Sequence, residues 1–402
     1  MIFGSQSWDV RTFRYSVLAM TGSNLPYIEA ASIVPLSVGT GDGAIKLINA
    51  NDIGAAKIDF SRITIERSVA ENIARQLEPL IAQEKWPPNN SPANTMRGID
   101  FYTKEDFVFA TKWAAAIFKA RLGYVPNLAS PMTFNERIFA RKFFAPLPMP
   151  SLADKLAAYD YVKARLGDEY IPRIVWVGDD PNEFLAAKLP TGKFVLKANN
   201  GWGRNLFLSL PGDLLVKRDE IANQATGWLQ FPFGYGWGEW QYCTYKPRLF
   251  LEEFIDFGDG RVPDDYKFFC FRGKAHLIEI DVDRHTQTRT GFYHPSWQHI
   301  PVAYTKEPIQ RERPHNLDEM LRIAEAIAHG MEFARIDLYS DRKSKIIFGE
   351  ITFTPSNAGA RFSDPKFDLW LGSHFGQDAD IRSSYFCPCD KLGQAAARID
   401  RA

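Results

Sequence analysis

The chain has 402 residues, of which 45% are hydrophobic and 14% aromatic, enough for two or three domains with substantial cores. Its 48 basic and 48 acidic side chains cancel, which argues against a general binder of nucleic acid or membrane surfaces, because such binding rests on a basic excess. Four cysteines without a CxxC pair are too few and too scattered for a disulfide framework, so we expect a reducing, cytoplasmic setting.

The first part of the chain carries few structural signals. Residues 32–38 and 44–48 are predicted strands around a glycine turn, and residues 69–83 have the spacing of an amphipathic helix. Proline and asparagine gather in residues 85–92, which predicts a linker. No apolar run reaches the roughly 18 residues that span a bilayer, and the start lacks the basic and apolar regions of a secretory signal. We therefore expect no integral membrane segment.

From about residue 98 the pattern is that of a mixed α+β enzyme. A capping box at Thr133 starts one helix, and a second helix opens at Asp154 and stops at Gly167. Residues 317–329 form a third predicted helix. The predicted strands are residues 171–177, 193–198, 206–210, 248–255, 266–271 and 275–282. Strands interspersed with helices in this way predict an α+β fold.

Two carboxylates near the C-terminus are placed to share a cation. Residues 333–339 and 345–353 have the composition of strands joined by a polar turn. If the connection is a two-residue hairpin at 343–344, Asp337 lies directly opposite Glu350, whereas a slip of two residues makes them diagonal neighbours. Like charges across a ladder are destabilising unless something neutralises them, and Mg²⁺ bound by carboxylate oxygens would do so. The alternative is two surface acids on a hairpin.

A glycine-bearing loop is a candidate phosphate site. Lys197 ends an apolar strand, and residues 199–205 follow it with Gly201 and Gly203. Such a loop lets backbone N–H groups approach phosphate oxygens, while the lysine supplies a point charge. The loop is neither a Walker A motif nor a dinucleotide fingerprint, and an ordinary hairpin turn is the alternative.

Acids and bases also mark the next strands. Glu252 and Glu253 lie in an apolar run that is either an edge strand or a hinge whose backbone meets an adenine edge. Asp265 and Lys267 share one face of the following strand, where ribose hydroxyls and phosphate are their candidate partners.

Taken in order, these blocks resemble the ATP-grasp ligases, and more narrowly the TupA-like branch, which is named for teichuronopeptide biosynthesis and associated with bacterial surface polysaccharides. The similarity spans roughly residues 120–376. The blocks that carry it are Phe134-Asn135-Glu136-Arg137, Asp154-Lys155, Val195-Leu196-Lys197, Leu251-Glu252-Glu253-Phe254-Ile255, Asp265-Tyr266-Lys267, Arg335-Ile336-Asp337 and Gly349-Glu350-Ile351-Thr352-Phe353.

The resemblance implies an ATP-grasp fold, in which two α+β lobes grip ATP, with an extra N-terminal segment. The implied division is an N-terminal segment of unknown role (1–95), a helical lead-in (96–190), a small lobe (191–256), a large lobe with the metal site (257–380) and a C-terminal tail (381–402). The implied ATP-binding residues are Lys155, Lys197, Gly201, Gly203, Glu252, Glu253 and Asp265. In this reading the two lysines contact the α- and β-phosphates, the glycine loop closes over them, the two glutamates line the adenine slot, and the aspartate holds ribose.

The resemblance also implies a metal site and its neighbours. Asp337 and Glu350 would ligate Mg²⁺, with Thr352 as a weaker third ligand where the wider superfamily usually has asparagine. Arg335 and Lys267 would stabilise the transferring phosphoryl group.

The substrate groups are harder to place from the sequence. Arg284 follows a strand that should face the cleft, and its guanidinium is a candidate to hold a substrate carboxylate in a bidentate fork. Arg361 is a second candidate. The implied reaction joins a carboxylate to an amine through an acyl phosphate, with ATP and Mg²⁺ as cofactors. Its substrates are a small-molecule amine and a carboxylate, with a saccharide-linked acid in surface-polymer synthesis as the favoured option.

Two other functions remain open at this point. Asp281-Val282-Asp283 has the DxD form that holds a metal and a sugar diphosphate in glycosyltransferases, but this reading leaves Lys155 and Lys197 unexplained. A nucleotide-binding protein without turnover is the third possibility. The sequence predicts neither the oligomeric state nor the identity of the acid and amine.

Overall fold

The structure is a computed structural model. It describes residues 67–82, 104–144, 147, 149–230, 233, 239–243, 245–258, 263–283, 288–304 and 308–376. The strands predicted at 32–38 and 44–48 and the linker predicted at 85–92 lie outside these residues. The division of the chain into domains stays a prediction.

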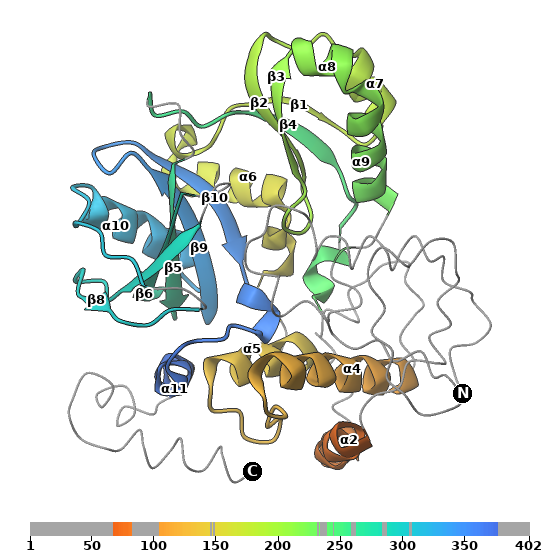
Figure 1. Ribbon diagram of the computed structural model, residues 1–402, viewed down its shortest axis with the longest axis vertical. Coiled ribbons are helices and arrows are strands. Elements are labelled where there is room, and N and C mark those ends of the chain that lie inside the picture. Colours follow the sequence, from red (N-terminus) through yellow and green to blue (C-terminus); the bar gives the residue numbers. More distant parts are fainter. Residues whose placement is uncertain are drawn as a thin grey trace.

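The smaller sheet has four antiparallel strands in the order β1-β4-β2-β3. Their bounds are β1 Ile174–Gly178, β2 Gly192–Ala198, β3 Asn205–Leu210 and β4 Leu249–Glu253. Phe194 and Leu196 alternate with Val195 and Lys197 along β2, so one face is fully apolar. Three helices cover that face: α7 (Pro181–Ala186), α8 (Gly212–Val216) and α9 (Arg218–Gln230) (Figure 1). The opposite face, which carries Lys197, turns toward α6 (Lys155–Leu166).

The larger sheet has six strands in the order β10-β9-β5-β6-β7-β8. Their bounds are β5 Asp264–Phe271, β6 Lys274–Val282, β7 Arg289–Tyr293, β8 His299–Ile300, β9 Phe333–Ser340 and β10 Ile346–Thr352. Helix α10 (Leu317–Ala328) covers one face, where its buried side chains meet Phe268, Ile278 and Ile336. Helices α5 (Phe134–Phe144) and α11 (Pro365–Ser373) cover part of the other face (Figure 1).

The second face of the large sheet is divided along the length of its strands. In β5, Phe269 and Phe271 pack against α5 and α11, whereas Asp265 and Lys267 project from the same face nearer to the small sheet. The neighbouring strands repeat this division because their residues are paired in register across the sheet. One half of the face is therefore core, and the other half is a charged surface.

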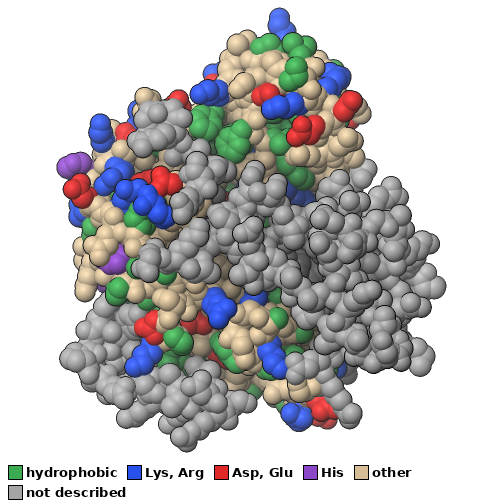
Figure 2. Space-filling view, in the orientation of Figure 1, with side chains coloured by type: hydrophobic (Ala, Val, Ile, Leu, Met, Phe, Trp, Pro, Cys, Tyr) green, Lys and Arg blue, Asp and Glu red, His purple; other side chains and the backbone are tan. Residues whose placement is uncertain are grey.

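The remaining described helices complete the core around α5. Helix α4 (Lys104–Leu122) packs against α5, and α2 (Arg67–Ala82) packs on α4 and lies below it in Figure 1. Short 3₁₀ turns are η3 (Pro150–Ala153), η4 (Asp168–Tyr170), η6 (Trp240–Cys243) and η7 (Pro355–Ala358). On the face in Figure 2, the described basic and acidic side chains are interspersed. No helix among the described residues is both long and apolar enough to cross a membrane.

The capping box predicted at the start of α5 is confirmed. The Glu136 N–H donates to Thr133 Oγ1 at 3.1 Å, and the Thr133 N–H donates to Glu136 Oε2 at 3.1 Å. The next side chain, Asn135, is fully buried and donates through Nδ2 to Ala360 O and Asp368 Oδ2, both at 2.8 Å. Its Oδ1 accepts the Ala360 N–H at 2.8 Å. Asn135 therefore locks α5 to α11 and to the loop that follows β10.

Replacing Asn135 with alanine is expected to lower the free energy of unfolding by about 3 kcal/mol, because two buried backbone groups and a buried carboxylate lose their partner. Urea titration followed by circular dichroism measures this value. Asn182→Ala on the exposed side of α7 is the matched control. A loss in Asn135→Ala no larger than in the control would mean that the loop does not depend on this lock.

Candidate active site

Asp337 and Glu350 lie directly opposite each other on β9 and β10, as the sequence predicts. The route to this register differs from the expected hairpin. The ladder starts at Ser340 opposite Ile346, so the connection has five residues, and a bulge between Phe348 and Glu350 then shifts the register by one. Gly349 forms this bulge.

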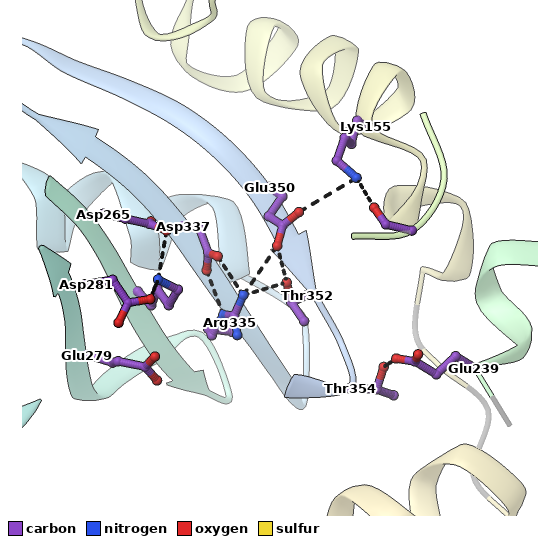
Figure 3. Close-up of polar contacts among 12 residues, drawn as sticks. Lys155, Glu239, Asp265, Glu279, Asp281, Arg335, Asp337, Glu350, Thr352 and Thr354 are labelled. Carbon is purple, nitrogen blue, oxygen red and sulfur yellow. Dashed lines mark hydrogen bonds and ion pairs between the residues drawn. The ribbon is translucent and has the colours of Figure 1, made fainter. Parts of the chain in front are cut away.

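Arg335 lies between these two acids (Figure 3). Its Nε donates to Asp337 Oδ1 at 2.8 Å and its Nη2 to Asp337 Oδ2 at 2.6 Å, which is a bidentate pair. The same Nη2 lies 3.3 Å from Glu350 Oε1 and 3.2 Å from Thr352 Oγ1. Thr352 Oγ1 in turn donates to Glu350 Oε1 at 3.1 Å. The guanidinium thus places a positive charge beside both acids, and the predicted metal site at this pair stays a prediction.

Lys267 extends the charged surface across the sheet. In the strand ladders, Lys267 lies opposite Asp337 of β9 on one side and opposite Glu279 of β6 on the other. Its Nζ donates to Asp265 Oδ2 at 2.7 Å and to Asp281 Oδ2 at 2.5 Å. One face of the large sheet therefore carries a lysine and four acids side by side: Lys267 with Asp265, Glu279, Asp281 and Asp337.

Burial changes the ionisation of two of these acids. It raises the pKa of Asp337 to about 7, with Asp265 and Glu350 adding to the rise and Arg335 opposing it. Burial together with Asp281 also raises the pKa of Glu279 to about 7, and Tyr304 OH donates to Glu279 Oε2 at 2.7 Å. Both carboxyls thus change charge near neutral pH and respond to any cation placed beside them.

Replacing Glu279 with glutamine is expected to change how stability depends on pH. The folded state holds the Glu279 proton up to about pH 7, whereas the ordinary pKa is 4.5. The folded state therefore binds more protons between these values, and this group makes the free energy of unfolding fall as pH rises through that window. Relative to wild type, Glu279→Gln should gain stability from pH 4.5 to 7 and level off above.

Urea titrations of the metal-free protein at pH 5, 6, 7 and 8 measure this difference, with Glu183→Gln on α7 as an exposed control. A constant offset between Glu279→Gln and wild type across the series would contradict the raised pKa.

Lys155 brings the helix between the two sheets into this site. Asp154 caps α6 by accepting the Leu156 N–H at 2.9 Å, which places Lys155 at the first helical position. The Lys155 Nζ donates to the carbonyl oxygen of Gly201 and lies 3.8 Å from Glu350 Oε2. Nearby charge from Lys155 and Arg335 outweighs burial and lowers the pKa of Glu350. Lys155 therefore links the glycine loop to Glu350.

The glycine loop connects β2 to β3 as predicted, with Lys197 opposite Asn205. Gly201 has φ of +77°, and a Cβ there would lie 2.4 Å from the ring of Phe233, so only glycine fits. Gly203 has φ of +70° with open space around it. The backbone of this loop can adopt the turn and remain open on one side.

Lys197, which is predicted to contact phosphate, also has a carboxylate partner on the small sheet. Its Nζ forms an ion pair with Glu252, which is 1% exposed and also accepts from Tyr159 OH at 2.8 Å. Burial opposes the charge of Lys197, but Glu252 more than offsets it and raises the lysine pKa. Glu253 points outward and pairs with Arg173 at 2.8 Å.

The structure therefore brings most of the candidate residues together. One surface unites Asp265, Lys267 and Asp337, which are buried, with the part-buried Lys155, Arg335, Glu350 and Thr352. Lys197 and Glu252 lie on the facing side of the small sheet. Arg284 lies outside the described residues. Sequence reasoning missed Tyr159 and Glu279. A signal for Glu279 was present, since it alternates with Ile278 and Ile280 in an apolar strand.

The oxygen donors at the β9–β10 pair fit a hard divalent cation. Asp337, Glu350 and Thr352 supply two carboxylates and a hydroxyl on one face, and such ions commonly complete their shell with water and phosphate oxygens. Among the described residues, no group of three or more histidine, cysteine or acidic side chains is arranged as a complete metal cage. The site thus fits a cation that is also held by a substrate.

Comparisons with known proteins give one family and several similar solved structures. A family model described as TupA-like ATPgrasp matches residues 138–376. Similar solved structures include the ATP-grasp ligase PsnB complexed with a minimal precursor, at 14% identity and TM-score 0.31, covering 56% of this chain and 62% of that one.

Two others are an L-amino acid ligase from Bacillus licheniformis (13% identity, TM-score 0.37, 57% and 51% covered) and a D-alanine–D-alanine ligase from Bacillus anthracis complexed with ATP (13%, 0.30, 52% and 58%). In all three, the chain covers less than two thirds of the solved protein. The search of curated proteins gave no match.

Proposed function

Since the chain belongs to the TupA-like ATP-grasp family, we propose that it is an ATP-dependent carboxylate–amine ligase that forms an amide through an acyl phosphate. One observation carries the proposal: the opposed acids Asp337 and Glu350 share one face of the large sheet with Arg335 and Lys267, and Lys155 reaches it from α6. A phosphoryl group placed between the large sheet and α6 would have Arg335 and Lys267 on one side and Lys155 on the other.

Each residue has a role in this proposal. Lys155 and Lys197 hold the α- and β-phosphates, and the loop with Gly201 and Gly203 closes over them to exclude water. Asp265 holds the ribose.

The buried glutamate on the small sheet has an indirect role. Because Glu252 carries the countercharge of Lys197 and is 1% exposed, it positions the lysine. The adenine would then meet the backbone beyond Glu253.

Arg335 and Lys267 stabilise the transferring phosphoryl group and then the oxyanion at the acyl carbon. No side-chain nucleophile is needed. The substrate carboxylate attacks the γ-phosphate and releases ADP, and the amine then attacks the acyl carbon of the acyl phosphate, releasing phosphate and losing a proton to leave the amide. Asp337, Glu350 and Thr352 would hold Mg²⁺, which supplies Lewis-acid neutralisation of phosphate charge when bound.

The proposed substrates are an amino acid and a carboxylate carried by a sugar, and the proposed setting is surface-polymer synthesis in the cytoplasm. The family membership supports this choice. The contacts of the DxD motif at residues 281–283 argue against a glycosyltransferase. Both of its acids already have basic partners, because Asp281 is paired with Lys267 and Asp283 with Arg289.

The test is an acceptor screen with purified full-length protein and hydroxylamine as a surrogate amine. An acyl phosphate reacts with hydroxylamine to give a hydroxamate, so the proposal predicts ADP, phosphate and hydroxamate in equal amounts with a productive acid. Use of a nucleotide-sugar donor without consumption of ATP would contradict the ligase and favour the transferase. Tight ATP binding without turnover across a broad panel of acids would favour a non-catalytic protein.

A further inference from the structure

The acids on the charged surface of the large sheet differ in whether they have a basic partner. Glu279 of β6 forms no ion pair with any of the described residues. The others are already paired: Asp265 and Asp281 with Lys267, Asp337 with Arg335, and Glu350 with Arg335 and Lys155. Glu279 is therefore the acid on this surface whose charge remains available to a bound cation.

The carboxyl group of Glu279 is held at one oxygen and open at the other. Tyr304 OH donates to Glu279 Oε2 at 2.7 Å, and the Tyr304 ring stacks on Phe362 with ring centres 5.3 Å apart. The side chain of Glu279 is mostly buried, but its Oε1 has no hydrogen-bond partner among the described residues and is not one of their fully enclosed atoms. A ligand atom can therefore reach Oε1 while Tyr304 keeps the carboxyl group in place.

The position of Glu279 on the sheet suits the last step of the proposed reaction. Glu279 and Asp337 lie opposite Lys267 on its two sides, so two strand spacings, or about 10 Å, separate them. In Figure 3, as in the order of the strands, Arg335 lies between Glu350 and Glu279. With a phosphoryl group beside Asp337 and an acyl carbon beside Arg335, Glu279 faces the side from which an amine reaches the acyl carbon.

The surroundings of Glu279 bring its ionisation close to neutral pH. Burial raises its pKa to about 7, and Asp281 on the same strand adds to the rise. Lys267 of β5, Arg335 of β9 and the Tyr304 hydroxyl oppose it. A proton acceptor works best when its pKa lies near the pH at which the enzyme operates, and a carboxylate in an ion pair is a weaker base.

We propose that Glu279 is the general base of amide formation, with Oε1 binding the ammonium group of the amine substrate and accepting its proton. This inference rests on the proposed ligase function and assigns the proton acceptor that the reaction needs. The ammonium nitrogen has no lone pair until one proton moves to Oε1, and it then attacks the acyl carbon. As the C–N bond forms and the C–O bond to phosphate breaks, the second proton leaves with the phosphate. Glu279 afterwards returns its proton to water.

The experiment compares two acceptors in one variant, Glu279→Gln. Hydroxylamine is largely uncharged at pH 7 and needs no such base, whereas an amino acid arrives as an ammonium ion. The hydroxamate screen supplies the acid, and the amine is the one that wild type uses fastest among the common amino acids and ammonium chloride. Glu279→Gln is expected to form amide at least roughly 100-fold more slowly and hydroxamate within about threefold of wild type, since general-base catalysis contributes about 10²–10⁴-fold.

The two acceptors share every step before the amine attacks, so hydroxamate formation also reports whether the variant is folded. Glu183→Gln, at an exposed position on α7, should match wild type with both acceptors. An equal loss with both acceptors, or unchanged amide formation, overturns the proposal. Hydroxamate without amide from any amine of the panel overturns it as well, because no ammonium is then used. Failure of wild type to consume ATP with any acid contradicts the ligase itself.

Tyr304→Phe tests the same assignment with the carboxylate in place. The Tyr304 hydroxyl lowers the pKa of Glu279, so its loss should move the acidic limb of the pH profile for amide formation to higher pH. The profile for hydroxamate formation should not move, because groups of the phosphoryl site such as Asp337 affect both acceptors alike. A limb that stays in place, or that moves equally for both acceptors, overturns the assignment to Glu279.

Discussion

Replacing Asp337 with asparagine is expected to lower turnover roughly 10³-fold while leaving the fold intact. A divalent ion supplies several kcal/mol of charge stabilisation to phosphoryl transfer, and each 1.36 kcal/mol corresponds to a factor of ten in rate. Asparagine keeps the shape of the side chain and can still accept from Arg335, so the loss would come from charge rather than packing. Glu350→Gln should behave in the same way, because its carboxylate is the other half of the pair.

The rate is measured as phosphate released with a productive acid and hydroxylamine, and the fold is followed by circular dichroism and thermal unfolding. Asp168→Asn, at a site where the side chain is 75% exposed, is the matched control and should retain full activity. Full activity in either Asp337→Asn or Glu350→Gln would refute the assignment of the metal ligands.

Replacing Arg335 with methionine is expected to separate metal binding from catalysis. In the structure the guanidinium is 2.6 Å from Asp337 Oδ2 and 3.3 Å from Glu350 Oε1, so it competes with a cation for the same oxygens. Removing this charge should tighten Mn²⁺ binding about tenfold. Two unit charges about 4 Å apart interact by about 1 kcal/mol in water and about 4 kcal/mol near a protein surface. Turnover should nevertheless fall roughly 10²–10³-fold, because the transferring group loses a cation.

Mn²⁺ binding is measured by electron paramagnetic resonance and turnover by phosphate release. The titration is done at pH 8.5, because removing Arg335 also raises the pKa of Asp337 and a protonated carboxyl would hide the gain. Arg322→Met on α10 is the control, since its side chain is 55% exposed. Weaker Mn²⁺ binding by Arg335→Met than by wild type would show that the arginine supports the metal instead of competing with it.

Most strands of both sheets and the helices α5, α6 and α10 could be predicted from the sequence because their patterns are local. The alternation in β2 and β4, the cap at Asp154 and the helix ending at Gly167 all follow from neighbouring residues. The opposition of Asp337 and Glu350 was also predicted, although the structure reaches it through a five-residue connection and a bulge at Gly349. The longer connection moves the strand register by one residue and the bulge moves it back, so Asp337 again faces Glu350. No local sequence rule predicts this cancellation.

The remaining features depend on contacts that are distant in the sequence. Arg335 was expected beside Asp337, but its position between both acids depends on the pairing of β9 with β10. The contacts of Lys197 with Glu252 and of Lys142 with Asn357 join segments that are 55 and 215 residues apart. The elements that sequence reasoning missed include strand β7 and helices α7, α8, α9 and α11. Most of them are short, so their apolar patterns are weak.

The most direct test of the central claim is a crystal structure with a nonhydrolysable ATP analogue and Mn²⁺. We expect anomalous density for the ion between Asp337 and Glu350, with the triphosphate within reach of Lys155 and Lys197. An ion located away from this pair of acids, or a nucleotide bound outside the space between the two sheets, would contradict the account.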